Sequence, residues 1–416
     1  MTDTMTLETI AAVHPITGTN RLFAAGERAS YHQHVATFGS LDHNTAGNGL
    51  VAQLERSGLA GRGGAGFSVG RKFAAMGHGR FSRVWRSSAV VIANGAEGEP
   101  RSLKDERLLR DAPHLVIDGL LAAAAAVQAS KLYIYSTAAS QESVRRALRE
   151  RRDAHAVMVV EAPDTFISGE ASAVINSIEN GVPLPTDRTQ RLTTVGLKQR
   201  PTLIHNVETL AHVALIARYG ADWFRSVGTD RDPGTRLVTI SGAVQRELVL
   251  EVPGDTRIND IIRACGGDTE NVRAVLVGGY HGAWVTAAKL DANLSAPGLA
   301  PFGAHPGAGV LYVLPTNHCG LHITAEIVRY LARESAKQCG PCRYGLPEMA
   351  TLLEKIASGV RDPKLPAQLR AVSGSVVGRG SCHHPNGTTR LVLNTLEAFS
   401  DDVQAHLSGR CLRTAS

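Results

Sequence analysis

Four glycines and one arginine lie within the run Gly61-Arg62-Gly63-Gly64-Ala65-Gly66-Phe67, called the glycine loop below. Glycine has no Cβ atom, adopts positive φ angles and lets another molecule approach the main chain. Bare N–H groups that precede the start of a helix form a cradle for phosphate. Arg62 and the nearby Lys72 add cations, and Gly70 belongs to the same candidate cofactor-binding segment. The loop therefore predicts a nucleotide or flavin phosphate site, with a flexible turn as the alternative reading.

Composition places the chain among globular proteins and excludes several classes of function. Its 416 residues suffice for two to four domains, with 43% hydrophobic and 20% charged residues. The glycine loop lacks the Gly-Lys-Ser/Thr of a P-loop NTPase. The net charge is +6, but the basic residues are dispersed and do not alternate with aromatic residues. We therefore expect no nucleic-acid partner, whereas an acidic electron carrier or an anionic membrane surface would suit the charge.

Cysteine usage and hydropathy indicate the compartment. No apolar run approaches the roughly 18 residues that a membrane span needs, and the N-terminus shows no signal-peptide pattern. Six cysteines in a chain of this length do not make a secreted disulfide framework, so their clustering indicates metal or redox chemistry. We expect the chain in the cytoplasm, alone or on the cytoplasmic side of a membrane complex.

The order of the elements predicts three domains after an extended N-terminal arm over residues 1–48. In residues 49–230, short apolar runs alternate with helical segments, which indicates a parallel sheet with covering helices. Residues 235–300 follow a strand–strand–helix–strand order typical of a small β-grasp module. Residues 318–410 are mostly helical, with loops that carry cysteines.

Polar residues follow two predicted buried strands, at the edge where open α/β sheets bind ligands. Asn94 can exchange hydrogen bonds with a flavin ring edge, and Glu97 and Glu99 can accept them from hydroxyl or ring N–H groups. The pair Gly169-Glu170 lies at another strand end. The alternatives are a solvated acidic turn and a plain helix N-terminus.

A later segment, Asn206-Val207-Glu208-Thr209, follows an apolar stretch in the same way. Its side chains can add polar contacts to the same edge of the sheet. The alternative is that Asn206 simply caps a helix.

The cysteines at Cys339 and Cys342 flank Gly-Pro in a tight turn, and Cys382 follows about forty residues later. Zinc and iron–sulfur clusters both use this geometry. His383 or His384 is available as a fourth ligand, and a redox dithiol is the alternative function. The remaining three cysteines are expected to take no part, Cys319 as a packed thiol and the others as bystanders, namely Cys265 and Cys411.

These motifs, in this order, resemble the NADH-binding flavoprotein subunit of respiratory complex I, which is also found in NAD-linked hydrogenases and formate dehydrogenases. The resemblance covers about residues 49–400 and includes Lys104-Asp105 and Glu334-Ser335. It implies an FMN domain, a β-grasp module of the soluble-ligand-binding type and a helical domain with a 4Fe–4S cluster.

The resemblance also implies roles for residues. The glycine loop would hold the FMN phosphate and contact NADH, and Gly169 and Glu170 would flank the flavin ring. Glu97 and Glu170 are the candidate catalytic carboxylates. Cluster ligands would be Cys339, Cys342 and Cys382, with His383 as a candidate fourth. Further FMN contacts are expected from five polar side chains: Lys72, Asn94, Glu97, Asn206 and Thr209.

Several positions depart from the family's pattern. The first cluster cysteine reads Ala336, so a cluster would have three cysteines, three cysteines and a histidine, or be lost. Most other losses fall on the dinucleotide side of the flavin, at Ala75, Ala96 and Ala171. The segment that lines the dinucleotide site reads Arg188-Thr189-Gln190-Arg191, whose arginines can bind a phosphate such as the 2′-phosphate of NADPH.

Three functions follow. The first is a subunit of an NADH:acceptor oxidoreductase of the quinone type, in which a hydride from NADH or NADPH goes to FMN and single electrons go to the cluster. The second is a flavin–cluster relay that exchanges electrons with a ferredoxin or a 2Fe–2S partner subunit instead of NADH. The third is a scaffold subunit without chemistry.

Overall fold

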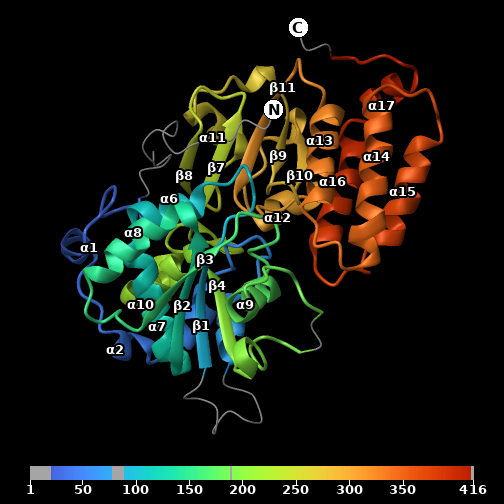
Figure 1. Cartoon of the computed structure of the whole chain (residues 1–416). Helices are drawn as coiled ribbons and strands as arrows, with labels where there is room; N and C mark the ends of the chain where they lie inside the picture. The colour runs from blue at the N-terminus through green and yellow to red at the C-terminus, as the bar shows by residue number, and fades with distance from the viewer. Residues whose placement is uncertain (1–19, 77–88, 188–189, 414–416) are drawn as a thin grey trace.

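Four parallel strands form the sheet of the first domain. The computed structural model describes residues 20–76, 89–187 and 190–413. The strand order is β3-β2-β1-β4, with every neighbouring pair parallel. Helices cover both faces (Figure 1), which explains why β1 is buried along almost its whole length. The strands are β1 (Ala89–Gly95), β2 (Ala129–Thr137), β3 (Val157–Ala162) and β4 (Thr202–Asn206).

The most extensive contact between two helices of this domain joins α7 to α10. Gly119 of α7 lies so close to α10 that a Cβ atom there would be 1.9 Å from the carbonyl oxygen of Leu210. The absence of a side chain therefore sets how closely these helices approach. The helices of the domain are α3 (Leu50–Ser57), α4 (Val69–Ala74), α6 (Lys104–Asp111), α7 (Pro113–Val127), α8 (Ala138–Arg149), α9 (Ala171–Asn180) and α10 (Val207–Arg225).

The prediction of an extended N-terminal arm is wrong for its described part. Residues 20–48 contain helices α1 (Tyr31–Phe38) and α2 (His43–Gly47). Ser30 begins α1 with a capping box, since its hydroxyl accepts a hydrogen bond from the main chain of Gln33. The ring of His34 then binds buried Asp118 of α7, at 2.8 Å. Local capping and one buried polar contact thus turn a weakly patterned segment into packed structure. Residues 1–19 lie outside the described residues.

The second domain confirms the predicted β-grasp module. Its sheet has the strand order β10-β9-β11-β7-β8. Strand β7 is the first of the module along the chain and β11 is the last, and the two lie side by side, parallel, inside the sheet. Strand β11 lies beyond residue 300, so the module continues past the predicted boundary. The elements are β7 (Thr235–Gly242), β8 (Leu248–Pro253), α11 (Ile258–Ala264), β9 (Val272–Val277), β10 (Ala283–Thr286), α12 (Ala296–Leu299) and β11 (Val310–Pro315). A short hairpin, β5 (Gly228–Thr229) and β6 (Asp232–Pro233), precedes it.

A helical domain packs beside the β-grasp sheet (Figure 1, orange to red). Trp284 of β10 is buried in the shared core, and its indole N–H donates to Thr324 of α13 at 3.0 Å. The cysteine-bearing loops therefore rest on a rigid two-domain body. The helices are α13 (Gly320–Arg333), a π-helical turn η7 (Pro341–Gly345), α14 (Leu346–Ala357), α15 (Leu365–Val376), α16 (His384–Ala398) and α17 (Ser400–Leu407). Across the described ranges, none of the helices has the length and apolar character needed to cross a membrane.

Candidate functional site

The candidate site lies where the chain order of the first sheet reverses, between β1 and β4. Asn206 ends β4, Asn94 is the last residue but one of β1, and the two are register partners. The side-chain amide of Asn206 donates to the carbonyl oxygen of Asn94 at 3.3 Å. Crevices at the carboxyl ends of strands beside such a reversal are the usual ligand sites of open α/β sheets. The two asparagines predicted from sequence therefore meet at the expected position.

The glycine loop is anchored over this crevice. The N–H of Gly61 donates to the carbonyl of Phe67 at 2.8 Å and closes the loop. The N–H of Arg62 donates to the hydroxyl of Thr209 at 2.9 Å. A Cβ atom on Gly63 would lie 3.1 Å from Cβ of Asn206, so a side chain there would crowd the strand end.

The outer part of the loop forms an open cradle. Gly64 and Gly66 have φ angles of 103° and 64°, which residues with a Cβ atom rarely adopt. A Cβ atom on Gly66 would meet no atom within 4 Å. Ala65 and Phe67 are exposed on the same stretch. Main-chain groups in an open loop above a strand end fit a phosphorylated ligand such as FMN.

The charges near the loop differ from the prediction. The guanidinium of Arg62 is buried and lies 3.7 Å from Asp232, so its charge serves an internal ion pair and its main chain faces Thr209. Lys72 is half-buried, and its ammonium donates to the carbonyl of Ile204 in β4. The ammonium of Lys72 therefore lies against β4, two residues before the end of the strand.

Gly70, predicted as a cofactor contact, has a packing role in this structure. A Cβ atom at Gly70 would lie 2.7 Å from the main chain of Glu55. The glycine thus lets α4 approach α3 closely, because the two helices cross at this point.

Glu97, predicted as a flavin contact and a catalytic carboxylate, instead caps α6. Its carboxylate accepts hydrogen bonds from the N–H groups of Asp105 and Glu106 at 3.0 and 3.1 Å, and from the hydroxyl of Ser102. Burial raises the pKa of Glu97, although Lys104 and these hydrogen bonds act in the opposite direction. This carboxylate therefore fixes the shape of the loop after β1.

Glu99, unlike Glu97, has a carboxylate oxygen that lacks a hydrogen-bond partner among the described residues. One carboxylate oxygen accepts the N–H of Tyr280 at 2.7 Å, which links the loop after β1 to the β-grasp module. Its other oxygen, Oε1, is buried and has no hydrogen-bond partner among the described residues. Burial raises the pKa of Glu99 to about 7. An orphaned buried oxygen beside the crevice fits a ligand donor, so Glu99 is the stronger candidate for ligand contact.

A buried charge network supports the crevice from below, and it joins the pair Lys104-Asp105 to Glu208 and Asn206 of the later segment. The ammonium of Lys104 lies 2.6 Å from Asp105 and 2.9 Å from Glu208. Asp105 in turn accepts a hydrogen bond from the amide of Asn206 at 2.5 Å. Burial raises the pKa of Asp105 to about 7, against the effect of Lys104. The network holds the Asn206 amide in one orientation.

Gly169 and Glu170 complete the rim of the crevice. The carbonyl of Gly169 accepts the side-chain amide of Asn94 at 2.9 Å, and a Cβ atom there would lie 2.8 Å from the carbonyl oxygen of Ala96. Glu170 is the N-cap of α9, where it accepts the N–H groups of Ser172 and Ala173. The helix-capping alternative therefore describes the contacts of Glu170, while Gly169 joins two strand-end loops.

The predicted metal cysteines lie around the turn η7. Hydrogen bonds from the N–H groups of Cys342 and Ser381, and from the Cys342 thiol, lower the pKa of Cys339 despite the opposing effect of its burial. Burial, with the nearby Cys339 and Cys382, raises the pKa of Cys342 to about 12. Three neighbouring cysteines, two of which receive main-chain N–H hydrogen bonds, fit an iron–sulfur cluster, whose potential depends on such hydrogen bonds.

The two histidines after Cys382 lie in different environments. His383 is exposed at the N-cap of α16. His384 is buried, its Nε2 hydrogen-bonds the carbonyl of Leu331 at 2.9 Å, and its ring contacts Phe166. The alternative of His384 as a ligand therefore gives way to a packing role, and His383 stays a candidate.

A direct contact joins the two candidate sites. The N–H of Phe166, three residues before Gly169, donates to the carboxylate of Glu334 at 3.3 Å. Glu334 begins the loop that leads through Ala336 to Cys339. The Phe166 ring also packs on rings from both other domains, Tyr280, His281, Tyr330 and His384. The flavin-side rim and the cysteine loop are thus fixed relative to each other.

Comparison with known proteins agrees with this geometry. Residues 54–215 match the family model of the Nuo51 FMN-binding domain, and residues 322–406 match that of the NADH-ubiquinone oxidoreductase-F iron–sulfur binding region. The chain therefore carries both regions of such a flavoprotein subunit, the FMN-binding region first and the iron–sulfur binding region second.

Relatives of the chain include the F 2 subunit of the NADH-quinone oxidoreductase of Rhizobium meliloti, 27% identical over 87% of this chain and 89% of the relative. Another is the HndC subunit of the NADP-reducing hydrogenase of Solidesulfovibrio fructosivorans, 26% identical over 87% of this chain and 76% of the relative. Among solved structures, a chain of an air-oxidized NAD+-reducing [NiFe]-hydrogenase is similar, with a TM-score of 0.80 and 26% identity over 95% of this chain and 68% of that one.

Proposed function

We propose that this chain is the flavoprotein subunit of a multi-subunit oxidoreductase that transfers electrons from a reduced nicotinamide dinucleotide through FMN to an iron–sulfur cluster and on to a partner protein. The observation that carries the proposal is the glycine loop held over the crevice between β1 and β4, with the loop that leads to Cys339 and Cys342 joined to the same rim. The family of the chain supports the same assignment.

FMN, when bound, accepts two electrons as hydride and releases them one at a time. The main chain of Gly63 to Gly66 and the ammonium of Lys72 would hold its phosphate. Asn94, Asn206 and Thr209 would orient the rest of the flavin at the strand ends, and Glu99 would accept a hydrogen bond from the flavin or the dinucleotide. Lys104 and Asp105 act through Asn206 and are positioning residues.

The cluster would be held by Cys339, Cys342 and Cys382. The structure has Ala336 where the family has its first cysteine, so the fourth coordination position would be filled by an external ligand or by His383 after a local movement. A histidine ligand would raise the reduction potential relative to a thiolate, because a neutral nitrogen replaces an anionic sulfur.

A second candidate function, a flavin–cluster relay, differs from the first in its electron donor. Ala96 and Ala171 lie next to Gly169 and Glu170 on the rim, where the family has acidic side chains. Fewer polar contacts for a dinucleotide favour a relay that receives electrons from a ferredoxin or partner subunit. Arg191 is exposed and available for the extra phosphate of NADPH, whereas Arg188 lies outside the described residues.

Anaerobic reconstitution with FMN, iron and sulfide, followed by titration with NADH, NADPH and a reduced ferredoxin, tests the proposal. We expect one reduced dinucleotide to bleach the flavin absorbance and then the cluster absorbance. Bleaching by the ferredoxin alone would support the relay. A colourless chain that takes up neither FMN nor iron would contradict both and leave the scaffold.

The variant Cys342→Ala should lose iron and keep FMN, with Cys265→Ala as the control because Cys265 is a buried cysteine of the β-grasp module. Measurement of iron and flavin per chain checks this. Equal iron in Cys342→Ala and wild type would refute the cysteine assignment.

A further inference from the structure

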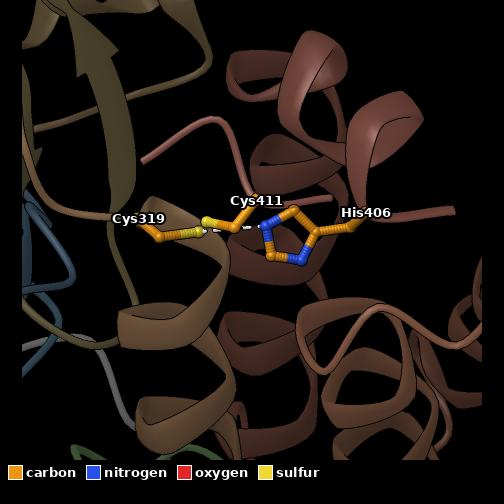
Figure 2. Close-up of side chains that lie close together, drawn as sticks. All are labelled: Cys319, His406 and Cys411. Carbon is orange, nitrogen blue, oxygen red and sulfur yellow. Dashed lines mark hydrogen bonds between the residues drawn. The ribbon is translucent and has the colours of Figure 1, made fainter. Parts of the chain in front are cut away.

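Two cysteines expected to be bystanders meet a histidine at the far end of the helical domain. Cys319 precedes α13, His406 lies in α17 and Cys411 lies in the tail that follows α17 (Figure 2). The two sulfur atoms and one histidine nitrogen all lie within 4.8 Å of one another. Within the part of the chain that the structure describes, no other three such donors come this close. We propose that Cys319, His406 and Cys411 form a zinc site, distinct from the iron–sulfur cysteines.

The spacing of the donor atoms fits a single ion. Zinc binds thiolate sulfur at about 2.3 Å and histidine nitrogen at about 2.0–2.1 Å, so two of its ligand atoms lie at most about 4.6 Å apart, close to the 4.8 Å within which these three donors already lie. The sulfur of Cys319 is 3.6 Å from Nε2 of His406, and Figure 2 shows the Cys411 sulfur beside both atoms. Side chains from two distant segments of the chain, the start of α13 and the C-terminal end of α17 with its tail, thus converge on one point.

The histidine is oriented as metal-binding histidines usually are. Nδ1 of His406 hydrogen-bonds the carbonyl oxygen of Ala357 at 2.8 Å. A carbonyl only accepts hydrogen bonds, so Nδ1 carries the proton and Nε2 presents its lone pair toward Cys319. A carbonyl behind the ring fixes the tautomer and the orientation of a ligating imidazole.

Main-chain hydrogen-bond donors also face the Cys319 sulfur. Main-chain N–H groups of Leu321 and His322, at the start of α13, donate hydrogen bonds to the sulfur of Cys319. Two thiolates balance the charge of Zn²⁺, and the nearby Arg273 is already paired with Asp402. Cys319 and His406 are buried, whereas Cys411 is half-exposed, which leaves a side for the ion to enter and for a fourth ligand such as water.

The soft donor set favours zinc over hard cations such as Mg²⁺ or Ca²⁺, which take oxygen ligands. A bound zinc would tie the C-terminal tail to α17 and to the start of α13. It would therefore stabilise the outer end of the helical domain without contacting the flavin crevice.

The test is zinc and iron per chain, measured separately on the full-length protein purified with zinc in the medium, followed by competition with a chromophoric zinc chelator. We expect about one zinc per chain. Loss of a hydrogen-bond partner behind a ligand weakens metal binding about 10- to 100-fold, so loss of a ligand in Cys411→Ser should weaken it at least about 100-fold. Cys411 is half-exposed, so this variant should fold even if Cys319→Ala does not.

Two controls separate this site from the proposed cluster. The triple variant Cys339→Ala/Cys342→Ala/Cys382→Ala should lose iron and keep the zinc, while Cys265→Ala should keep both. Zinc that is lost with the triple variant, or that is unchanged in Cys411→Ser, would overturn the proposal. So would a wild-type mass lower by two hydrogens with no zinc bound, if Cys411→Ser removes that difference, since this shows a disulfide that includes Cys411.

Discussion

Replacement of Glu99 by glutamine should stabilise the ligand-free chain at neutral and higher pH. The carboxyl of Glu99 is buried at the rim of the crevice, and burial raises its pKa from 4.5 to about 7. Glutamine keeps an oxygen that can accept the N–H of Tyr280, so the link to the β-grasp module is preserved. The variant therefore removes the charge and places a neutral amide group at the position of Oε1.

The sign and size follow from proton linkage. Below the unfolded pKa the carboxyl is protonated in both states and imposes no penalty on folding. As the pH rises through 4.5 toward about 7, only the unfolded state ionises freely, so the folded state loses stability. Each unit of pKa corresponds to about 1.4 kcal/mol, so the full penalty above the folded pKa is up to about 3 kcal/mol.

The assay is chemical denaturation of ligand-free wild type and Glu99→Gln at several pH values between about 5 and 8. We expect the variant to gain little at the acid end and up to about 3 kcal/mol at the alkaline end. Glu142→Gln is the control, since Glu142 is exposed on α8. The same pH dependence in wild type and Glu99→Gln would refute the reasoning.

Three further substitutions test other parts of the structure. Gly66→Ala places a methyl group in the open cradle and should weaken FMN binding at least about tenfold in a flavin titration. Gly181→Ala is the control, because Gly181 lies at the C-cap of α9 with a similar φ of 70° and a Cβ atom there would also meet no atom within 4 Å. Asp118→Ala should destabilise the chain by about 3–5 kcal/mol at pH 7, because it leaves buried Arg151 and Arg218 without their shared carboxylate. Despite its burial, a hydrogen bond from His34 and these arginines hold the pKa of Asp118 low, so wild type should keep this stability above pH 4 and lose it only in stronger acid. An unchanged acid denaturation profile in the variant would contradict this. Gly119→Ala puts a Cβ atom 1.9 Å from the carbonyl oxygen of Leu210 and should cost about 3 kcal/mol or more in thermal unfolding, whereas Gly374→Ala in α15, with open space around it, should be neutral or stabilising.

Much of the fold could be predicted because local patterns and global packing agree. Apolar runs alternating with helices gave the parallel sheet, and the strand–strand–helix–strand order gave the β-grasp module. The N-terminal segment was misjudged, because α1 depends on a cap at Ser30 and on the contact between His34 and Asp118, which are 84 residues apart. The end of the module was also misjudged, because β11 joins the sheet only through pairing with β7 and β9.

The amino-acid sequence by itself determined which main-chain loops can approach a ligand and which thiols can share a metal, because glycine content and Cys-x-x-Cys spacing act over a few residues. Only the tertiary structure decided which hydrogen-bond and ion-pair partners each polar side chain has. Glu97 caps α6, Arg62 pairs with Asp232, and Glu99 keeps a buried oxygen without a partner among the described residues. Only the fold brings Cys319 to His406 and Cys411, because contacts between distant segments depend on how helices pack and leave no periodic trace in the sequence.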